Sequence, residues 1–155
     1  MSKIILGKYV NTHGIKGEIR IKSNFPYKDK VFKKENKIII DNQEYIICSY
    51  RVHKGYDMIT LEGINDINKI PFRKNVLVYI NREDYLTTNE YLDSDLIGFI
   101  VYNSKFERKV LDILDINAKK KLIKTKEGYI PYELIKNVDL VNKKILIEDV
   151  NGLWK

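Results

Sequence analysis

The chain has little of what several protein classes require. Its 155 residues include a single cysteine, Cys48, which excludes an internal disulfide and any zinc site built from several cysteines. Cys48 lies in the apolar stretch 45–50, where we expect a buried and unreactive thiol. No apolar run approaches the roughly 20 residues that cross a bilayer, and the amino terminus lacks the long apolar core of a secretion signal. We therefore expect a cytoplasmic protein that has no membrane partner.

Residues that could activate one another for catalysis are also scarce. The two histidines, His13 and His53, fall in no motif that pairs them with Cys48 or with a carboxylate. The sequence contains neither a phosphate-binding loop of the Walker type nor the glycine fingerprint of a dinucleotide site. His13 has no companion ligand, which favours a hydrogen-bonding role over metal binding. We expect no catalytic residues, no cofactor and no metal.

Positive charge is concentrated near the amino terminus. The formal net charge is +7, and residues 1–37 alone carry ten Lys or Arg against three acids, so the rest of the chain is balanced. Such a local excess favours contact with a polyanion through its phosphates. Lysines that serve only solubility are the alternative, because the sequence does not show whether these charges share one face.

The spacing of apolar residues and turns predicts strands and few helices in the first half. Residues 28–34 are expected to form a short helix or a basic loop, and Asn65 or Asp66 could cap a short helix over 67–70. About six strands separated by short turns favour a small closed barrel, which leaves no exposed strand edge. The predicted strands cover residues 4–10, 18–22, 38–40, 45–53, 57–61 and 76–80.

A polar stretch without apolar periodicity divides the chain. We predict a linker over 82–89, between a first domain over 1–81 and a second domain over 90–155. Residues 133–137 are predicted to form a turn or a short helical piece. Five or so strands suit a second small barrel, so the predicted fold class is all-β, with two small β-barrels joined by a short linker. The strands expected in the second half cover 97–102, 109–116, 121–125, 128–132 and 144–148.

The loop between the first two predicted strands gathers polar side chains around two glycines. Gly14 and Gly17 can adopt positive φ without a Cβ clash, so the chain can turn sharply there. The turn would bring donors and positive charge to one rim of the sheet. Simple capping of the backbone is the alternative, because many hairpin loops look like this one. The rim residues predicted to bind a partner are Lys8, Asn11, Thr12, His13, Lys16, Arg20 and Lys22.

Three segments resemble the RimM family of ribosome maturation factors. Residues 7–21, GKYVNTHGIKGEIRI, are similar to the opening signature of that family, and residues 90–98, EYLDSDLIG, resemble the start of its carboxy-terminal PRC-type barrel. Further matches are Ile130-Pro131-Tyr132, residues 135–139 and residues 144–148, in the family's order. The resemblance spans nearly the whole chain. It implies a RimM-type barrel, similar to a translation-factor barrel, followed by a PRC-type barrel.

The resemblance also implies a function. It points to a non-enzymatic assembly factor that binds the maturing small (30S) ribosomal subunit and promotes 16S rRNA processing and folding of the subunit head. The implied partners are the small-subunit precursor, 16S rRNA and a head ribosomal protein (uS19 family). We expect a monomer whose basic first half contacts rRNA or the subunit through the rim residues, an assignment that rests on charge.

The family places two adjacent aromatic residues, usually tyrosines, at the entrance of its second barrel, with a role in binding a ribosomal protein. The matching positions here are Tyr91 and Leu92, and Leu92 departs from the pattern because it lacks the ring and the hydroxyl. Pro131 fixes φ and could aim Tyr132, so Tyr91, Leu92 and Tyr132 are the predicted ribosomal-protein contacts. Packing in the core is the alternative for these side chains. Gly98, like Gly14 and Gly17, is predicted to form a structural turn.

Two functions from other classes stay open at this point. Small barrels also host flavin-dependent reductases, and a fold does not fix a function, although no recognisable phosphate site is present. A permanent structural protein of the ribosome is the other alternative. Such a protein would remain on mature particles, whereas a maturation factor would favour precursors.

Overall fold

The computed structural model describes residues 2–117 and 119–149. It divides into two compact units, Met1–Thr87 and Thr88–Lys155, which we describe separately. Strands account for most of the regular structure in both units, which confirms the predicted all-β class. Within the described residues, no helix is long and apolar enough to cross a membrane.

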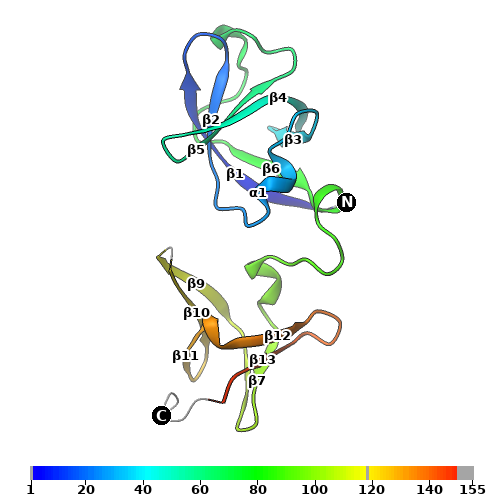
Figure 1. Ribbon diagram of the computed structural model, residues 1–155, viewed down its shortest axis with the longest axis vertical. Helices are drawn as coiled ribbons and strands as arrows, with labels where there is room; N and C mark the ends of the chain where they lie inside the picture. The colour runs from blue at the N-terminus through cyan, green and yellow to red at the C-terminus, as the bar shows by residue number, and fades with distance from the viewer. Residues whose placement is uncertain (1, 118, 150–155) are drawn as a thin grey trace. The chain divides into compact units, whose positions relative to one another are not determined.

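The first unit is a closed barrel of six strands (Figure 1). The strand order is β1-β2-β5-β4-β3-β6, and β6 pairs with β1 to close the ring. All six strands lie close to the predicted ranges. Their bounds are β1 Lys3–His13, β2 Glu18–Lys22, β3 Lys37–Ile40, β4 Gln43–His53, β5 Tyr56–Leu61 and β6 Leu77–Asn81.

Isoleucine dominates the interior of this barrel. Branched side chains suit the pleated surface of a strand, and each fully buried one contributes about 1.5–3 kcal/mol relative to its exposed state. Burial of these side chains fixes which face of each strand turns inward. The side chains that are less than 2% exposed include Ile19, Ile21, Ile38, Ile40, Ile47, Ile59 and Ile80.

Short helical turns join the strands of the first unit. Helix α1 covers Lys28–Val31, within the predicted range, and η1 covers Ile67–Lys69. The carboxylate of Asp66 accepts the N–H of Asn68 at 2.9 Å, as expected of a helix cap. Helix α2, Arg82–Tyr85, occupies part of the stretch predicted to be a linker. The domain limits at 81 and 90 stay a prediction.

The prediction of a buried Cys48 is wrong, because its thiol is exposed. The register of β4 against β5 shifts between Ile47 and Ser49. A bulge of this kind adds one residue to a strand and turns the following side chains to the other face. Cys48 is the extra residue of this bulge and has no partner on β5; Ile47 is buried, and the thiol of Cys48 is exposed on the opposite side.

The second unit consists of two sheets around one core (Figure 1). One sheet has the order β11-β10-β9, and the other has the order β12-β13-β7-β8, in which β13 and β7 run parallel. The two helical turns of this unit are η2 Asp93–Leu96 and η3 Tyr132–Leu134. The strand bounds are β7 Ile100–Tyr102, β8 Glu107–Lys109, β9 Asp112–Asn117, β10 Lys120–Thr125, β11 Gly128–Pro131, β12 Ile135–Asp139 and β13 Lys144–Ile147.

The segment 107–117 connects these two sheets. The N–H of Val110 donates to the carbonyl of Phe99 at 2.8 Å, whereas the N–H of Leu111 donates to the carbonyl of Lys124 at 2.8 Å. The chain thus leaves one sheet at Val110 and joins the other at Leu111. Both sheets cover the same buried side chains, among them Leu96, Val101, Val110, Ile123, Ile130 and Ile145.

Strand β1 passes very close to the end of β2 at Gly7. A Cβ placed on Gly7 would lie 2.5 Å from the carbonyl oxygen of Lys22 and 3.0 Å from the Cβ of Ser23. The register of β1 against β6 also shifts between Ile5 and Gly7. Glycine in a strand often marks such a close approach of two backbones.

We predict that Gly7→Ala lowers the free energy of unfolding by about 1–3 kcal/mol, because the backbone of β2 must shift to accept the added methyl group. Urea denaturation followed by circular dichroism would measure the change. Lys8→Ala, at an exposed neighbouring position, is the matched control and should alter stability by less than about 0.5 kcal/mol. An alanine variant as stable as the parent would contradict the close approach.

Candidate functional site

The hairpin formed by β1 and β2 separates the predicted rim residues by face. Thr12 lies opposite Ile19, which is fully buried, so Thr12 is on the inward side of the hairpin. Directly opposite residues of an antiparallel pair project to the same face, and neighbours in sequence project to opposite faces. The remaining pairs therefore share the outer side of the barrel: Lys8 with Lys22, Asn11 with Arg20, and His13 with Glu18.

The loop 14–17 is held by the segment that follows β5. Gly14 and Gly17 adopt φ values of +70° and +84°. The N–H of Ile67 donates to the carbonyl of Ile15 at 3.0 Å, and Gly17 faces the backbone of Ile64 and Asp66. This packing fixes the tip of the hairpin and leaves Lys16 exposed at its end.

Strands β5 and β4 extend the outer side with residues that the sequence analysis did not select. Met58 lies opposite both Arg20 and Arg51, and Tyr56 lies opposite His53. The polar and apolar alternation of 51–53 was visible in the sequence, but the pairing of β5 with β2 was not. We call the resulting surface the basic face; it comprises Lys8, Asn11, His13, Arg20, Lys22, Arg51 and His53.

Close contacts order the centre of the basic face. The Nη2 of Arg20 lies 2.8 Å from the Nδ1 of His13, and its guanidinium lies 5.9 Å from the centroid of the Tyr56 ring. A guanidinium can only donate, so Nδ1 of His13 is the acceptor of this hydrogen bond. Arg51 donates two hydrogen bonds to the carboxylate of Glu18, at 2.9 and 2.7 Å. These contacts orient both guanidinium groups on the outer side of the barrel.

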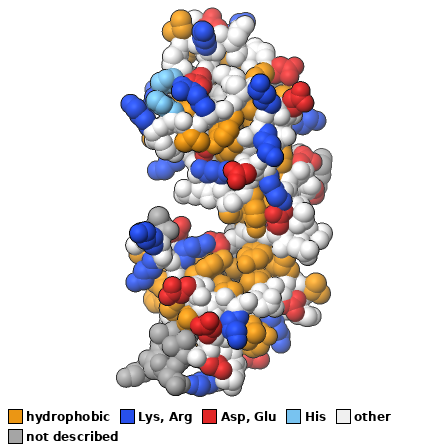
Figure 2. All heavy atoms as spheres, in the orientation of Figure 1, with side chains coloured by type: hydrophobic (Ala, Val, Ile, Leu, Met, Phe, Trp, Pro, Cys, Tyr) orange, Lys and Arg blue, Asp and Glu red, His pale blue; other side chains and the backbone are white. Residues whose placement is uncertain are grey.

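The positive charges of the basic face disfavour protonation of the His53 imidazole. The His13 and His53 ring centroids are 5.3 Å apart, and Figure 2 shows the histidines among blue Lys and Arg side chains. Burial, followed by the charges of Arg51 and His13, lowers the pKa of His53. The hydrogen bond from Arg51 lowers the pKa of Glu18, which keeps this carboxylate ionised. A bound phosphate would reverse the effect on His53, because a negative charge stabilises imidazolium.

The basic face also contains two buried polar atoms that have no hydrogen-bond partner among the described residues. They are Oδ1 of Asn11 and Nε of Arg20, and these residues lie opposite each other on β1 and β2. Buried polar atoms are usually paired with protein or with ordered water.

In the second unit, the structure brings Tyr132 to the turn that follows Leu92. The hydroxyl of Tyr132 donates to Oδ1 of Asp93 at 3.0 Å, while Nζ of Lys121 lies 2.5 Å from the other carboxylate oxygen of Asp93 and 4.1 Å from the centroid of the Tyr132 ring. Tyr91 and Tyr132 both pack partly against the core of this unit. We call Tyr91, Leu92 and Tyr132 the aromatic patch.

Gly98 lies in the turn between η2 and β7. Its φ is +92°, and its N–H donates to the carbonyl of Val110 at 2.8 Å. Side chains at positive φ are strained, so glycine suits this turn. The hydrogen bond ties the turn to the segment that connects the two sheets.

Across residues 2–117 and 119–149, no group of three or more His, Cys, Asp or Glu side chains could hold a metal ion. The arrangement of the described side chains instead offers two kinds of binding surface. The basic face carries positive charge and hydrogen-bond donors, and the aromatic patch carries large rings beside polar groups.

Comparisons with known proteins place these surfaces in context. Residues 4–85 match the family model described as the RimM N-terminal domain. The chain is 40% identical to the ribosome maturation factor RimM of Staphylococcus aureus (strain bovine RF122 / ET3-1), with 97% of this chain and 98% of the relative covered. The RimM of S. aureus strain MRSA252 is 38% identical over the same shares.

Two solved structures are also similar to this chain. One is a crystal structure of a Pseudomonas aeruginosa protein described as a 16S ribosomal RNA processing protein, RimM; it is 17% identical, has a TM-score of 0.47, and is covered over 98% of its length by 96% of this chain. The other is the solution structure of the N-terminal domain of RimM from Thermus thermophilus. It is 15% identical, has a TM-score of 0.46, and is covered over 94% of its length by 54% of this chain.

Proposed function

The chain belongs to the RimM family of ribosome maturation factors, and from that membership we propose that it binds the maturing small (30S) ribosomal subunit and promotes 16S rRNA processing and head folding. The family is non-enzymatic, so the alternative of a flavin-dependent reductase is not retained. The proposal further assigns the chain to the cytoplasm as a monomer.

The basic face is the observation that carries the proposal for RNA. Residues 2–87 hold sixteen Lys or Arg against ten acids, whereas residues 88–149 hold eleven of each. The excess charge therefore belongs to the barrel that bears the basic face. Phosphate contacts from such a surface give affinity through the release of counterions. The oriented arginines add specificity, because a guanidinium can bind a phosphate with two parallel hydrogen bonds.

The aromatic patch supports the second contact that we propose, with a head ribosomal protein (uS19 family). Tyrosine combines a large apolar area with a hydroxyl, and it is enriched among residues that dominate interface energies. Tyr132 is held by Asp93 and Lys121, so little side-chain freedom is left to lose on binding. Leu92 retains apolar area at the position where the family usually has a second ring.

An assembly factor of this kind acts by differential affinity. Binding RNA and protein together stabilises the arrangement of the head in which both surfaces are occupied at once. The factor dissociates when the mature subunit no longer offers that arrangement. This mechanism breaks and forms no covalent bond.

Sedimentation of a cell extract tests the proposal. The protein would be quantified across the soluble pool, free small subunits and complete ribosomes, at low and moderate salt. We expect enrichment on free small subunits and little on complete ribosomes. A stoichiometric amount on complete ribosomes would indicate a permanent structural protein, and confinement to the soluble pool at both salts would contradict subunit binding.

We also predict that RNA binding strengthens as the pH falls from about 7.5 to about 5.5. The pKa of His53 is lowered in the free protein, and a bound phosphate would raise it, so the complex takes up a proton and acidification favours binding. The groups facing His53 are His13 on β1, Glu18 and Arg20 on β2, and Arg51 and Lys54 on or beside β4.

Fluorescence anisotropy with a labelled single-stranded RNA would measure this pH dependence. The variant His53→Asn keeps a polar side chain that does not titrate, and it should bind with a flatter pH profile. A profile identical to that of the parent would show that His53 does not take up the proton.

A further inference from the structure

Strand β10 is lysine-rich although the second unit is electrically balanced. Five lysines lie between 119 and 126, and the unit has equal numbers of basic and acidic residues over 88–149. Lys121 is neutralised by Asp93. Lys119 and Lys120 are exposed, and in the described part of the chain neither ammonium group forms an ion pair. Their charge is therefore available to a ligand.

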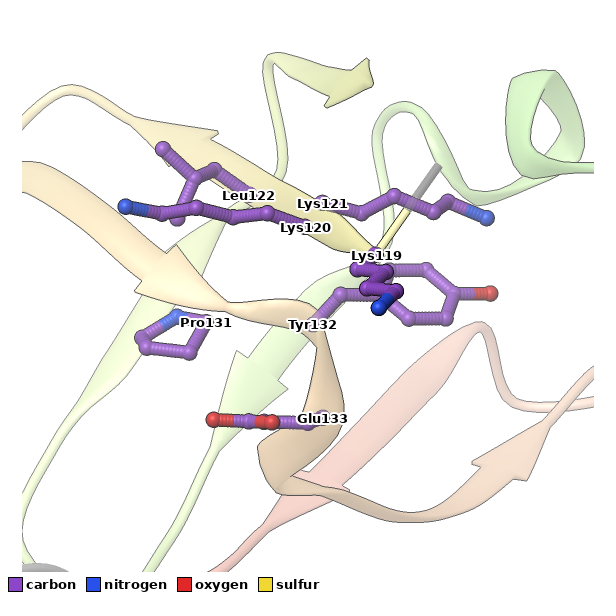
Figure 3. A pocket seen from close by; sticks show the side chains of 7 residues that line it. All are labelled: Lys119, Lys120, Lys121, Leu122, Pro131, Tyr132 and Glu133. Carbon is purple, nitrogen blue, oxygen red and sulfur yellow. The ribbon is translucent and has the colours of Figure 1, made fainter. Parts of the chain in front are cut away.

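These two lysines border a cavity of about 430 Å³ (Figure 3). Leu122 and Pro131 lie directly opposite each other on β10 and β11 and supply an apolar wall. The ring of Tyr132 supplies another wall, held by the hydroxyl contact to Asp93 and by the ammonium of Lys121. Glu133, the next residue, contributes an exposed carboxylate to the lining. The volume is within the range of small-molecule sites.

The lining restricts the chemistry of the ligand. The ammonium groups of Lys119 and Lys120 favour a negatively charged group on the ligand. The apolar walls favour a flat or apolar part, and they consist of Leu122, Pro131 and Tyr132. Glu133 requires a hydrogen-bond donor and repels a second negative charge. An acidic peptide satisfies the lysines but meets repulsion at Glu133. A nucleotide satisfies all three demands, because its phosphate, its base plane and the amino group of its base are separate parts.

We propose that this pocket binds one nucleotide of single-stranded RNA, with the phosphate at Lys119 and Lys120 and the base amino group donating to Glu133. Cytosine, adenine and guanine carry such an amino group, and uracil does not. The site therefore prefers these three bases over uracil. The inference rests on the proposed function in taking rRNA as the target, but it concerns a surface of the second unit; its residues lie outside the basic face, and it shares only Tyr132 with the aromatic patch.

Nuclear magnetic resonance on the isotope-labelled full chain would test the pocket directly. Titrations with cytidine monophosphate, uridine monophosphate, cytidine and inorganic phosphate would follow the backbone amides of 119–122 and of Tyr132 and Glu133. We expect cytidine monophosphate to shift these amides at concentrations at least about fivefold lower than uridine monophosphate. Cytidine or phosphate alone should bind more weakly than the monophosphate.

Substitutions in the pocket would show which residues contact the phosphate and which contact the base. The double variant Lys119→Ala with Lys120→Ala should lower the affinity for cytidine monophosphate roughly tenfold, because two charge-assisted contacts are lost. Lys136→Ala with Lys143→Ala makes the same change in charge at exposed positions outside the pocket and should have no effect. Glu133→Gln should remove the preference for cytidine over uridine while leaving phosphate binding in place.

The proposal would be overturned if the Lys119/Lys120 variant and the Lys136/Lys143 variant lost equal affinity for cytidine monophosphate. It would also be overturned if Glu133→Gln kept the preference for cytidine over uridine. An acidic peptide that shifts the same amides more strongly than the nucleotide would assign the pocket to a protein segment and would also overturn it. The sedimentation experiment separates this proposal from the proposed function. If the protein binds the nucleotide but not small subunits, only the proposed function is contradicted. If it binds small subunits but not the nucleotide, only the pocket proposal is contradicted.

Discussion

Replacing Lys8 and Lys22 by glutamate is expected to weaken binding to free small subunits by about tenfold to a hundredfold at low salt. The two lysines lie opposite each other on β1 and β2 and are exposed, so the exchange reverses charge on the basic face without opening the core. Each lost phosphate contact should also reduce the slope of log affinity against log salt by roughly 0.7–0.9.

Filter binding of purified free small subunits over a series of salt concentrations would give both quantities. Lys33→Glu with Lys34→Glu is the matched control, because it changes the net charge of the same unit equally at exposed positions outside the basic face. If the two pairs weaken binding equally, total charge rather than the basic face governs association. If neither changes the salt slope, the first barrel does not contact phosphates.

Tyr91→Ala is expected to weaken binding to the purified head ribosomal protein by at least about thirtyfold, the loss typical of a dominant interface residue. The aromatic ring of Tyr91 packs partly on the core of the second unit, so its loss removes contact area at the edge of the aromatic patch. Isothermal titration calorimetry with the full chain would measure the affinity, and Tyr91→Phe should retain most of it.

A matched variant separates this contact from a general loss of stability. Leu140 also packs partly against the same core but lies outside the aromatic patch. Leu140→Ala should lower the melting temperature and leave the affinity near that of the parent. If Leu140→Ala weakens binding as much as Tyr91→Ala does, the effect of Tyr91 is on folding and its assignment to the interface fails.

The strands of the first barrel could be predicted because their local patterns agree with the fold. Isoleucine-rich runs such as 38–40, ended by turn residues, give the same strands in the sequence and in the structure. The apolar run 45–50 did not show which of its residues face the core: Ile47 is buried, whereas Cys48, the unpaired residue of the bulge, is exposed. A bulge depends on the partner strand, which local periodicity does not describe.

The second unit shows the same limit at two places. Residues 133–137 were predicted to form a turn or a short helical piece; η3 includes 133 and 134, but 135–137 belong to β12, in which a register shift after Ile135 breaks the alternation. The predicted strand 109–116 was one segment, whereas the structure divides it into β8 and β9 at Val110 and Leu111. Pairing with other strands determined both the start of β12 and the division between β8 and β9, since short segments have only a weak intrinsic preference for the strand conformation.

The candidate site was predictable where it lies within one hairpin. Lys8, Asn11, His13, Arg20 and Lys22 fall on β1 and β2, and the short loop between these strands made their proximity foreseeable. Arg51 and His53 come from β4, which reaches them only through β5. Thr12 lies opposite the buried Ile19, and its position within the loop motif did not reveal this inward placement.

The closure of the first barrel by β1 and β6 has a consequence for synthesis of the chain. Lys3 lies opposite Asn81 and Ile4 lies opposite Ile80, so the pairing that completes the ring joins the first and last strands of the unit. Contacts so distant in sequence form late in folding. On the translating ribosome, the hairpin of β1 and β2 emerges well before β6, and one edge of β1 stays unpaired until then. A nascent chain stalled before residue 77 would expose that edge and be prone to aggregate.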